Sequence, residues 1–250
     1  MANYKLGKKP ARPGAFRLRL SFYLNAAALP PLPATFGHES LISYWGMLGN
    51  DNYGDCVWAG AAHEVMLLNK EANVDVSFTD ASVLSDYSAV TGFNPNDPAS
   101  DGGTDVQVAA AYRKSTGVLD AAGKRHTVAA YISIDPTNLT HLYYAGYLFG
   151  PVGIGIQFPS TAMDQFAAGQ PWDVVPGATI DGGHYVPLVG RQADGLHVIS
   201  WAKDQIMTEN FLHTYCDEAV AYVSQEALIN QKSPEGFDYD QLIQDLPLLS

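Results

Sequence analysis

The sequence predicts an α+β fold in which a group of helices precedes an antiparallel sheet. Apolar residues recur at helical spacing in three segments between residues 56 and 116. From residue 117 onwards, short runs of β-branched and alternating residues, separated by turn-forming residues, are typical of strands. This separation of the two patterns along the chain favours the α+β class.

Length and composition predict one main domain with an extension at each end. A chain of 250 residues that is 47% hydrophobic is long enough to bury a large core, and it fits one large domain better than two small ones. We assign residues 39–231 to this domain. Residues 1–38 form a basic, proline-rich N-terminal arm, and residues 232–250 form a C-terminal extension with a short helix.

The arm should be extended and poor in helix, because five prolines interrupt it. They are Pro10, Pro13, Pro30, Pro31 and Pro33. Phe16, Leu18 and Leu20 make the arm more apolar than a disordered linker. We expect these residues to pack against the body of the protein or an adjacent subunit, with a flexible tail as the alternative.

Charge is divided unevenly between the arm and the rest of the chain. All six basic residues of the arm precede the first acidic residue, Glu39, whereas the remaining chain holds 8 basic and 26 acidic residues, a net charge of −18. A surface this acidic repels nucleic acid and attracts a basic segment. We therefore expect no nucleic-acid partner. The arm is expected to lie on its own body or on a neighbouring subunit.

Three helices are predicted in the first half of the domain. The first spans residues 56–68, where apolar side chains recur every three or four positions and a second flank is also apolar, so it should be largely buried. The second spans residues 79–91, with Thr79 or Asp80 as its N-cap. A turn-rich loop separates it from a third helix over residues 106–116.

Strands are predicted at residues 117–119, 126–134 and 152–158 from their β-branched and alternating residues. Near the C-terminus, residues 210–224 are typical of a short helix followed by a final strand. Residues 237–246 then predict a small surface helix.

A hairpin is predicted over residues 182–204, with its turn at Asp194-Gly195. Such a turn pairs Ala193 with Leu196. In that register the face that carries His184 also carries three side chains of the returning strand, Ile199, Trp201 and Lys203.

Cysteine content and hydropathy indicate in which cellular compartment the protein is expected. The two cysteines, Cys56 and Cys216, lie 160 residues apart and cannot form a multi-bridge scaffold, so nothing calls for an oxidising environment. No apolar stretch approaches the length of a membrane span, and no apolar segment follows the N-terminal lysines as in a signal peptide. We expect no membrane partner, and a protein of the cytoplasm or of an intracellularly assembled particle.

No metal or other cofactor is expected. His63-Glu64 resembles the start of a zinc-binding helix, but the position four residues after His63 is Leu67 rather than a second histidine. Three aspartates crowd the loop before the third helix without the spacing of an EF-hand, and we expect them to be solvated. They are Asp97, Asp101 and Asp105.

One cysteine and one histidine carry the strongest signals for chemistry. Cys56 begins its predicted helix, where the positive end of the backbone dipole favours a thiolate. His184 follows Gly182 and Gly183 and precedes an apolar strand, which leaves room for a substrate. The alternatives are a buried, apolar role for Cys56 and a structural role for His184. Cys216 is expected in the core.

Three segments resemble papain-like cysteine peptidases. "YGDCVWAGAAHE" at residues 53–64 is similar to the nucleophile segment, and "GGHYVPLVGRQADGLHVISW" at 182–201 to the histidine strand with its following Ser-Trp pair. "DGGTDVQVAAAY" at 101–112 resembles the Gly-Gly segment that binds substrate backbone. The 128 residues between Cys56 and His184 are close to the family separation. The resemblance implies a two-lobed fold, with a helical lobe that begins at the cysteine and a β-sheet lobe that carries the histidine.

The resemblance also implies roles for individual residues. Cys56 matches the nucleophile and His184 the base, and Asn50 stands where the family has the glutamine of its oxyanion hole. Gly102 and Gly103 match the cleft wall. Ser200 and Trp201 match the pair that covers the histidine. The implied reaction is attack of a thiolate on the carbonyl of a peptide or protein substrate, followed by hydrolysis of a thioester.

Two departures from the family pattern leave alternatives open. The family asparagine that orients the histidine would fall at Ile199, which cannot accept a hydrogen bond from imidazole, and loss of the orienting group in a related triad costs about 10⁴ in turnover. The oxyanion-hole amide is carried by the shorter Asn50. Two interpretations follow: a cysteine peptidase or related acyl-transfer enzyme, or a catalytically weak or inactive papain-fold subunit of a larger assembly, such as a virion or surface lattice. A third makes the arm a propeptide that blocks the cleft.

Overall fold

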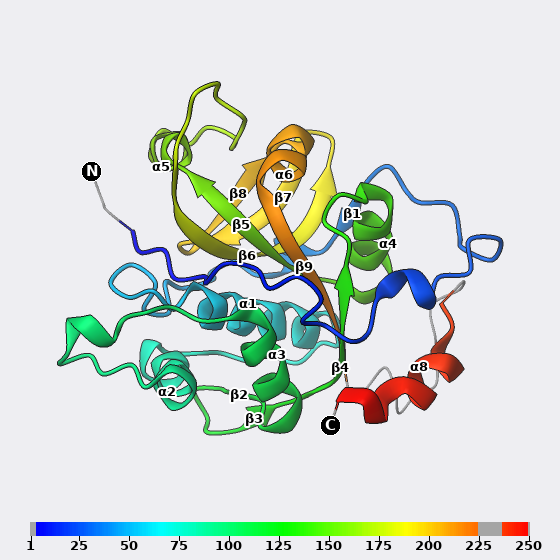
Figure 1. The fold of residues 1–250 in the computed structure, drawn as a ribbon, viewed down its shortest axis with the longest axis horizontal. Helices are drawn as coiled ribbons and strands as arrows, with labels where there is room; N and C mark the ends of the chain where they lie inside the picture. The colour runs from blue at the N-terminus through cyan, green and yellow to red at the C-terminus, as the bar shows by residue number, and fades with distance from the viewer. Residues whose placement is uncertain (1–3, 225–236, 250) are drawn as a thin grey trace.

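A computed structural model describes residues 4–224 and 237–249. Its helices α1, α2 and α3 pack on one side of the molecule, and strands β5 to β8 lie on the other (Figure 1). The first described part of the arm, in dark blue, runs between these two parts (Figure 1). No helix among the described residues is both long and apolar enough to cross a membrane.

The three helices predicted in the first half of the domain are present. They are α1 (Cys56–Glu71), α2 (Asp80–Thr91) and α3 (Val106–Ser115). Thr79 caps α2 by accepting a hydrogen bond from the Ser82 amide, and Asp105 caps α3 in the same way from Val108. A small hairpin of β2 (Val118–Leu119) and β3 (Arg125–His126) follows. Short 3₁₀ helices are η1 (Leu20–Phe22), η2 (Glu39–Leu41), η3 (Pro98–Ser100) and η4 (Leu246–Leu249).

Among the described residues, the main sheet has seven strands, and every adjacent pair is antiparallel. Its order is β4-β9-β5-β6-β7-β8, with β1 paired to β6. The bounds are β1 (Phe36–Gly37), β4 (Val128–Ile134), β5 (Val152–Pro159), β6 (Ile180–Gln192), β7 (Gly195–Ser200), β8 (Lys203–Met207) and β9 (Cys216–Ser224). The long strand β6, which carries His184, is therefore held by β5, β7 and β1.

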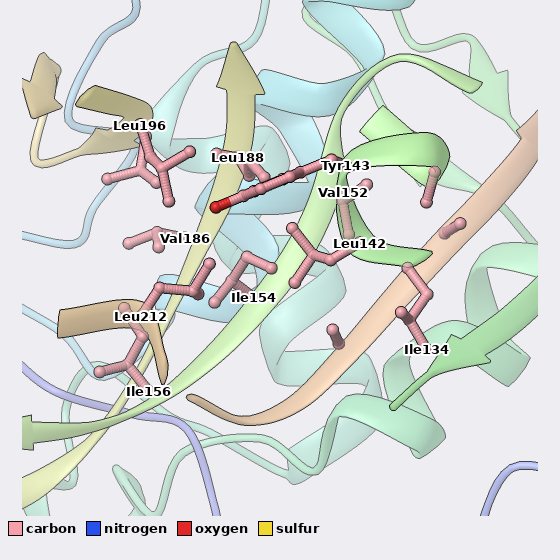
Figure 2. Close-up of a cluster of buried hydrophobic side chains, with 14 of the residues drawn as sticks. Ile134, Leu142, Tyr143, Val152, Ile154, Ile156, Val186, Leu188, Leu196 and Leu212 are labelled. Atoms are coloured by element: carbon pink, nitrogen blue, oxygen red, sulfur yellow. The ribbon is translucent and has the colours of Figure 1, made fainter. Parts of the chain in front are cut away.

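The largest core cluster lies on one face of this sheet. Side chains of alternate strand positions, such as Ile154, Val186 and Leu196, meet Leu142 of α4 (Leu139–Phe149) and Leu212 of α6 (Glu209–Tyr215) (Figure 2). The same cluster includes Leu18 and Leu20 of the arm, which are 2% and 1% exposed. The expectation that this part of the arm packs on the body is confirmed for these two leucines.

The sequence analysis did not predict α4 (Leu139–Phe149) or α5 (Ser160–Ala167). Helix α4 contains three tyrosines and ends in Phe149, residues of middling helix propensity, and its packing compensates for that propensity. Asn138 begins it by accepting a hydrogen bond from the His141 amide. Helices α6 (Glu209–Tyr215) and α8 (Tyr239–Asp245) were expected.

The predicted register of the β6–β7 hairpin is wrong. Gln192 pairs with Gly195, so that Ala193 and Asp194 form the turn, and the register shifts again between Leu188 and Gly190. Gly195 begins the strand with a φ of 143°, which glycine adopts readily. Two of the three side chains expected beside His184 are nevertheless its neighbours, because Trp201 stacks on its ring and Ile199 lines the same cavity.

Candidate active site

Helix α1 places Cys56 at its first position. The side chain is buried, at 1% exposure, and Cys56 and His184 line the same cavity of about 10 Å³. Gly60, one turn along, lies so close to strand β6 that a Cβ there would come within 2.7 Å of the Tyr185 ring. The close packing of α1 on β6 thus brings the cysteine and the histidine into one small space.

His184 contacts two residues at the β7–β8 turn. Its Nε2 lies 2.9 Å from the Ser200 hydroxyl, and its ring stacks on Trp201 with 4.4 Å between centroids. Its Nδ1 has no hydrogen-bond partner among the described residues. Trp201 and Ala202 have φ values of 45° and 63°, a left-handed conformation unusual for residues other than glycine. This strained turn holds the indole flat against the imidazole.

Ile199 lines the same cavity and packs with Trp45, Leu67 and Val189. Asp204 of β8 accepts a hydrogen bond from His197 at 2.9 Å rather than from His184. In the described structure, the polar group that contacts the His184 ring is therefore the Ser200 hydroxyl.

Asn50 also lines the cavity and is 3% exposed. Its amide donates to the Tyr53 carbonyl at 3.0 Å and, over a longer 3.4 Å, to the Lys5 carbonyl. The second acceptor belongs to the arm. The amide thus lies within reach of a peptide carbonyl that enters the site from another part of the chain.

Residues 4–9, which we call the strap, cross the site between the helices and the sheet. Three main-chain hydrogen bonds hold the strap: Lys8 N–H donates to Gly183 at 2.9 Å, Thr104 N–H to Gly7 at 2.7 Å, and Lys9 N–H to Thr104 at 2.9 Å. Tyr4 stacks on Trp201 with 4.9 Å between ring centroids. The strap is therefore held on both sides, by β6 and by the loop before α3.

Glycines allow the strap to approach this closely. A Cβ on Gly7 would lie 1.8 Å from the Gly54 carbonyl oxygen, and one on Gly103 would lie 2.2 Å from the Gly7 oxygen. Gly102, in contrast, is exposed and has no atom within 4 Å of its Cβ position. Of the glycine pair in the family motif, Gly103 contacts the strap, and Thr104 supplies the backbone bonds.

Burial keeps both reactive groups neutral. It raises the pKa of the Cys56 thiol to about 12, and the neighbouring Asp55 adds to the rise, while backbone groups of Tyr185 and Gly7 oppose it. Burial also lowers the pKa of His184 to about 3. With the strap in place, the pair is a thiol and a neutral imidazole rather than a thiolate–imidazolium ion pair.

A second buried polar cluster was missed by the sequence analysis. Glu64 on α1 pairs with Arg113 on α3 at 2.6 Å and accepts a 2.7 Å hydrogen bond from Tyr185 on β6. Arg113 also lies over the Tyr222 ring, 3.5 Å from its centroid. His63 next to Glu64 lies 3.1 Å from two backbone carbonyls. The available signal was a charged residue, Glu64, within a mostly apolar stretch of the predicted helix.

The loop aspartates have structural partners. Asp101 accepts from the Gly54 amide at 3.0 Å and from the Tyr87 hydroxyl at 2.6 Å, and Asp105 pairs with Arg12 of the arm. Asp97 accepts from the Ala99 amide. Within residues 4–224 and 237–249, no cluster of three side chains suited to a metal ion occurs.

Comparison with known proteins finds likeness in structure. No protein-family model and no curated protein matches the sequence. Xylellain, a cysteine protease from Xylella fastidiosa, matches 90% of this chain and 98% of its own with a TM-score of 0.67 and 12% identity. Digestive procathepsin L 3 of Tenebrio molitor larval midgut matches 86% and 76%, with a TM-score of 0.58 and 17% identity.

A third neighbour is the Carica candamarcensis cysteine protease CMS1MS2 in complex with E-64. It matches 77% of this chain and 99% of its own, with a TM-score of 0.52 and 13% identity. These likenesses agree with the elements described above, in which a helix that begins at Cys56 packs on an antiparallel sheet. The chain therefore has the papain-like fold of cysteine proteases.

Proposed function

We propose that this chain is a papain-like cysteine peptidase, or a related acyl-transfer enzyme, that acts on peptide-like substrates through Cys56 and His184. One observation carries the proposal. A cysteine at a helix N-terminus and a histidine on the facing strand line one cavity, and a peptide segment, the strap, lies hydrogen-bonded across it. The strap occupies the place of a substrate and keeps the enzyme latent.

The chemistry follows from the residues around the cavity. His184 takes the thiol proton, and the Cys56 sulfur attacks the substrate carbonyl to form a tetrahedral intermediate. The C–N bond then breaks, His184 gives its proton to the leaving amine, and a thioester remains on Cys56. Water hydrolyses the thioester, which releases the carboxylic acid and restores the thiol. The developing oxyanion accepts hydrogen bonds from the Cys56 N–H, one of the unpaired amides at the start of α1, and from Asn50. The contact between Asn50 and the Lys5 carbonyl supports this role, because it directs the same amide at a peptide oxygen.

Ser200 is a positioning residue in this proposal. Its hydroxyl, 2.9 Å from His184 Nε2, accepts a hydrogen bond from that nitrogen when the nitrogen carries a proton. The Nδ1 lone pair is then available as the base. Ser200 thus supplies the hydrogen bond that Ile199 cannot, through a side chain one residue further along the chain.

Release of the strap activates the pair. Burial is the largest cause of the raised pKa of Cys56 and of the lowered pKa of His184, so water that enters the site brings the two values toward each other. A thiolate and an imidazolium then become accessible near neutral pH. Activity is expected to depend on displacement of residues 4–9.

A second function, a catalytically weak or inactive papain-fold subunit of a larger assembly, is favoured by one observation. Both reactive groups are about 1% exposed, and their pKa values disfavour an ion pair while the strap is in place. If the strap never leaves, the cleft is a permanent internal packing surface. The two functions differ in whether Cys56 reacts faster than an ordinary thiol once exposed.

The test is labelling with a peptidyl electrophile, with the adduct located by mass spectrometry. Gly7→Ala in the full chain should dislodge the strap and increase labelling of Cys56 at least tenfold, whereas the control Ser115→Ala, at an exposed position of α3, should behave as the parent. Adding His184→Ala to Gly7→Ala should abolish the gain with the peptidyl reagent but not with iodoacetamide. If both reagents label Gly7→Ala equally well with and without His184, the thiol is not activated and the non-catalytic function holds.

A further inference from the structure

Lys8 is the most deeply buried cation of the arm. Its side chain is 0% exposed, whereas Lys9, the next residue, is exposed. The Lys8 ammonium contacts Asp217 at 2.9 Å, the Lys9 carbonyl at 2.9 Å and Glu218 at 3.1 Å. All three of its N–H groups therefore have an acceptor inside the cleft.

The pocket around this ammonium is built by β9 and β5. Asp217 and Glu218 are adjacent in sequence, and the β5–β9 register shifts at this point: Gly155 pairs with Glu218, while Ile156 pairs with Cys216. The shift leaves Asp217 as an extra residue, so that both carboxylates reach Lys8 instead of pointing to opposite faces.

Gly155 makes room for the lysine stem. A Cβ at this position would lie 2.2 Å from Lys8 Cε and 2.6 Å from Glu218 Cγ. A larger residue on this side of the pocket would therefore exclude the side chain. Gly155 leaves space for a long side chain, and the carboxylates of Asp217 and Glu218 lie where the positive charge of that side chain ends.

Two partly buried carboxylates need a counter-charge. Burial raises the pKa of Glu218, and Lys8 opposes that rise. Removing a partner from a buried ion pair is strongly unfavourable because the remaining charge is left uncompensated. Asp217 Oδ1 has no hydrogen-bond partner among the described residues, so the pocket also has an acceptor free for the extra donors of a guanidinium.

We propose that Asp217 and Glu218 form a specificity pocket that selects a lysine or arginine side chain of a peptide bound along the cleft. The inference rests on the proposed function for the identity of the cleft. In this proposal, Lys8 takes the place of the substrate side chain. The reason is that the Lys8 N–H donates a hydrogen bond to the carbonyl of Gly183, the residue before His184. The substrate class is thus a peptide with a basic residue next to the reacting site.

The first test uses the strap as an intramolecular ligand. In the full chain, Lys8→Met should raise the rate at which iodoacetamide labels Cys56 at least tenfold, whereas Lys8→Arg should keep the parent rate. Lys9→Met removes the same charge one residue away and should leave the rate unchanged. Equal rates for the Met and Lys side chains at position 8 would show that the pocket does not select charge.

The second test measures binding without catalysis. A full-length Cys56→Ala variant also carries Gly7→Val and Lys8→Met, so that its own strap cannot dock. Calorimetry then compares the peptide Tyr-Lys-Leu-Gly-Lys-Lys with versions in which the fifth residue is arginine or norleucine. The lysine and arginine peptides should bind about tenfold or more tightly than the norleucine peptide. The preference should disappear when Asp217→Asn and Glu218→Gln are added.

The two proposals fail in different ways. Equal binding of all three peptides, or binding of none, overturns the specificity pocket even if Cys56-dependent turnover is observed. A clear preference for the basic peptides, together with an unactivated Cys56 in the labelling experiment, supports the pocket and overturns the enzyme.

Discussion

At the residue scale, His184 depends on neighbours of two kinds. The Ser200 hydroxyl provides a polar contact at Nε2, and Trp201 provides an aromatic surface, so the ring is fixed in orientation while it remains buried and neutral. Trp201 also contacts Tyr4 of the strap. Trp201 therefore links the proposed base to the segment that covers it.

Ser200→Ala should reduce the free energy of unfolding by about 1–3 kcal/mol, because it leaves a buried imidazole nitrogen without a partner. Urea denaturation of the full chain measures the loss. Ser115→Ala, on an exposed part of α3, is the matched control and should change stability by less than about 0.5 kcal/mol. An equally small change for Ser200→Ala would argue against the hydrogen bond to His184.

Acid should destabilise the protein through its buried histidines. Burial lowers the pKa of His63 to about 4 and that of His184 to about 3, below an unfolded value of 6.5. Each neutral ring therefore contributes stability that is present above pH 6.5 and is lost as the pH falls toward the folded pKa. Between pH 7 and 5 the loss should be about 2 kcal/mol for each ring.

The histidine contribution is checked by urea unfolding at pH 7 and pH 5. His63→Gln removes one titrating group, so its stability should fall by about 2 kcal/mol less than that of the parent over this range. An identical pH dependence in the two proteins would show that His63 titrates normally in the folded state.

At the element scale, local patterns predicted the three helices of the first half well, but they missed α4 and α5 and gave the wrong hairpin register. Helix α2 was predictable because its N-cap Thr79 and its first turn are neighbours in sequence. The register of β6 with β7 depends on which residue after Ala193 enters the strand, and on an irregularity near Val189. Packing decides between these nearby conformations, and the turn and the irregularity together set which residues pair across the hairpin.

The hairpin should lose stability as the pH rises. Hydrogen bonds to Asp204 and Asp194 raise the pKa of His197 to about 9, above its unfolded value of 6.5. The stabilisation is complete below pH 6.5 and is lost as the pH increases through about 9. Thermal unfolding from pH 6.5 to 9.5 should show the decline, and Asp204→Asn should flatten it. A decline of the same size in that variant would assign it to other groups.

At the scale of the whole molecule, contacts between distant parts of the chain determine what the site can do. The resemblance to a family indicated Cys56, His184 and Asn50, and the structure brings all three to one cavity. The arm's positive charge predicted that it would dock, but the partners of Lys8 lie 209 and 210 residues away on β9. No local pattern specifies such a pairing, which arises only when the strap and the sheet are placed together.

Glu64 and Arg113 join the helices to the sheet in the same long-range way. Their side chains are each 1% exposed, and with Tyr185 and Tyr222 they connect α1, α3, β6 and β9. A buried ion pair adds little net stability compared with apolar residues, but removal of one partner leaves a buried charge. The pair therefore makes assembly of the two parts of the fold depend on both residues.

Arg113→Met should lower the free energy of unfolding by about 3–5 kcal/mol, because Glu64 is left uncompensated. Adding Glu64→Gln removes that charge and should restore part of the loss, so that the double variant is more stable than the single one. Lys70→Met breaks the exposed ion pair with Asp75 and should cost no more than about 1 kcal/mol. Chemical denaturation of the parent and the three variants measures these free energies of unfolding. If Arg113→Met is as stable as Lys70→Met, Glu64 is already neutral in the folded protein.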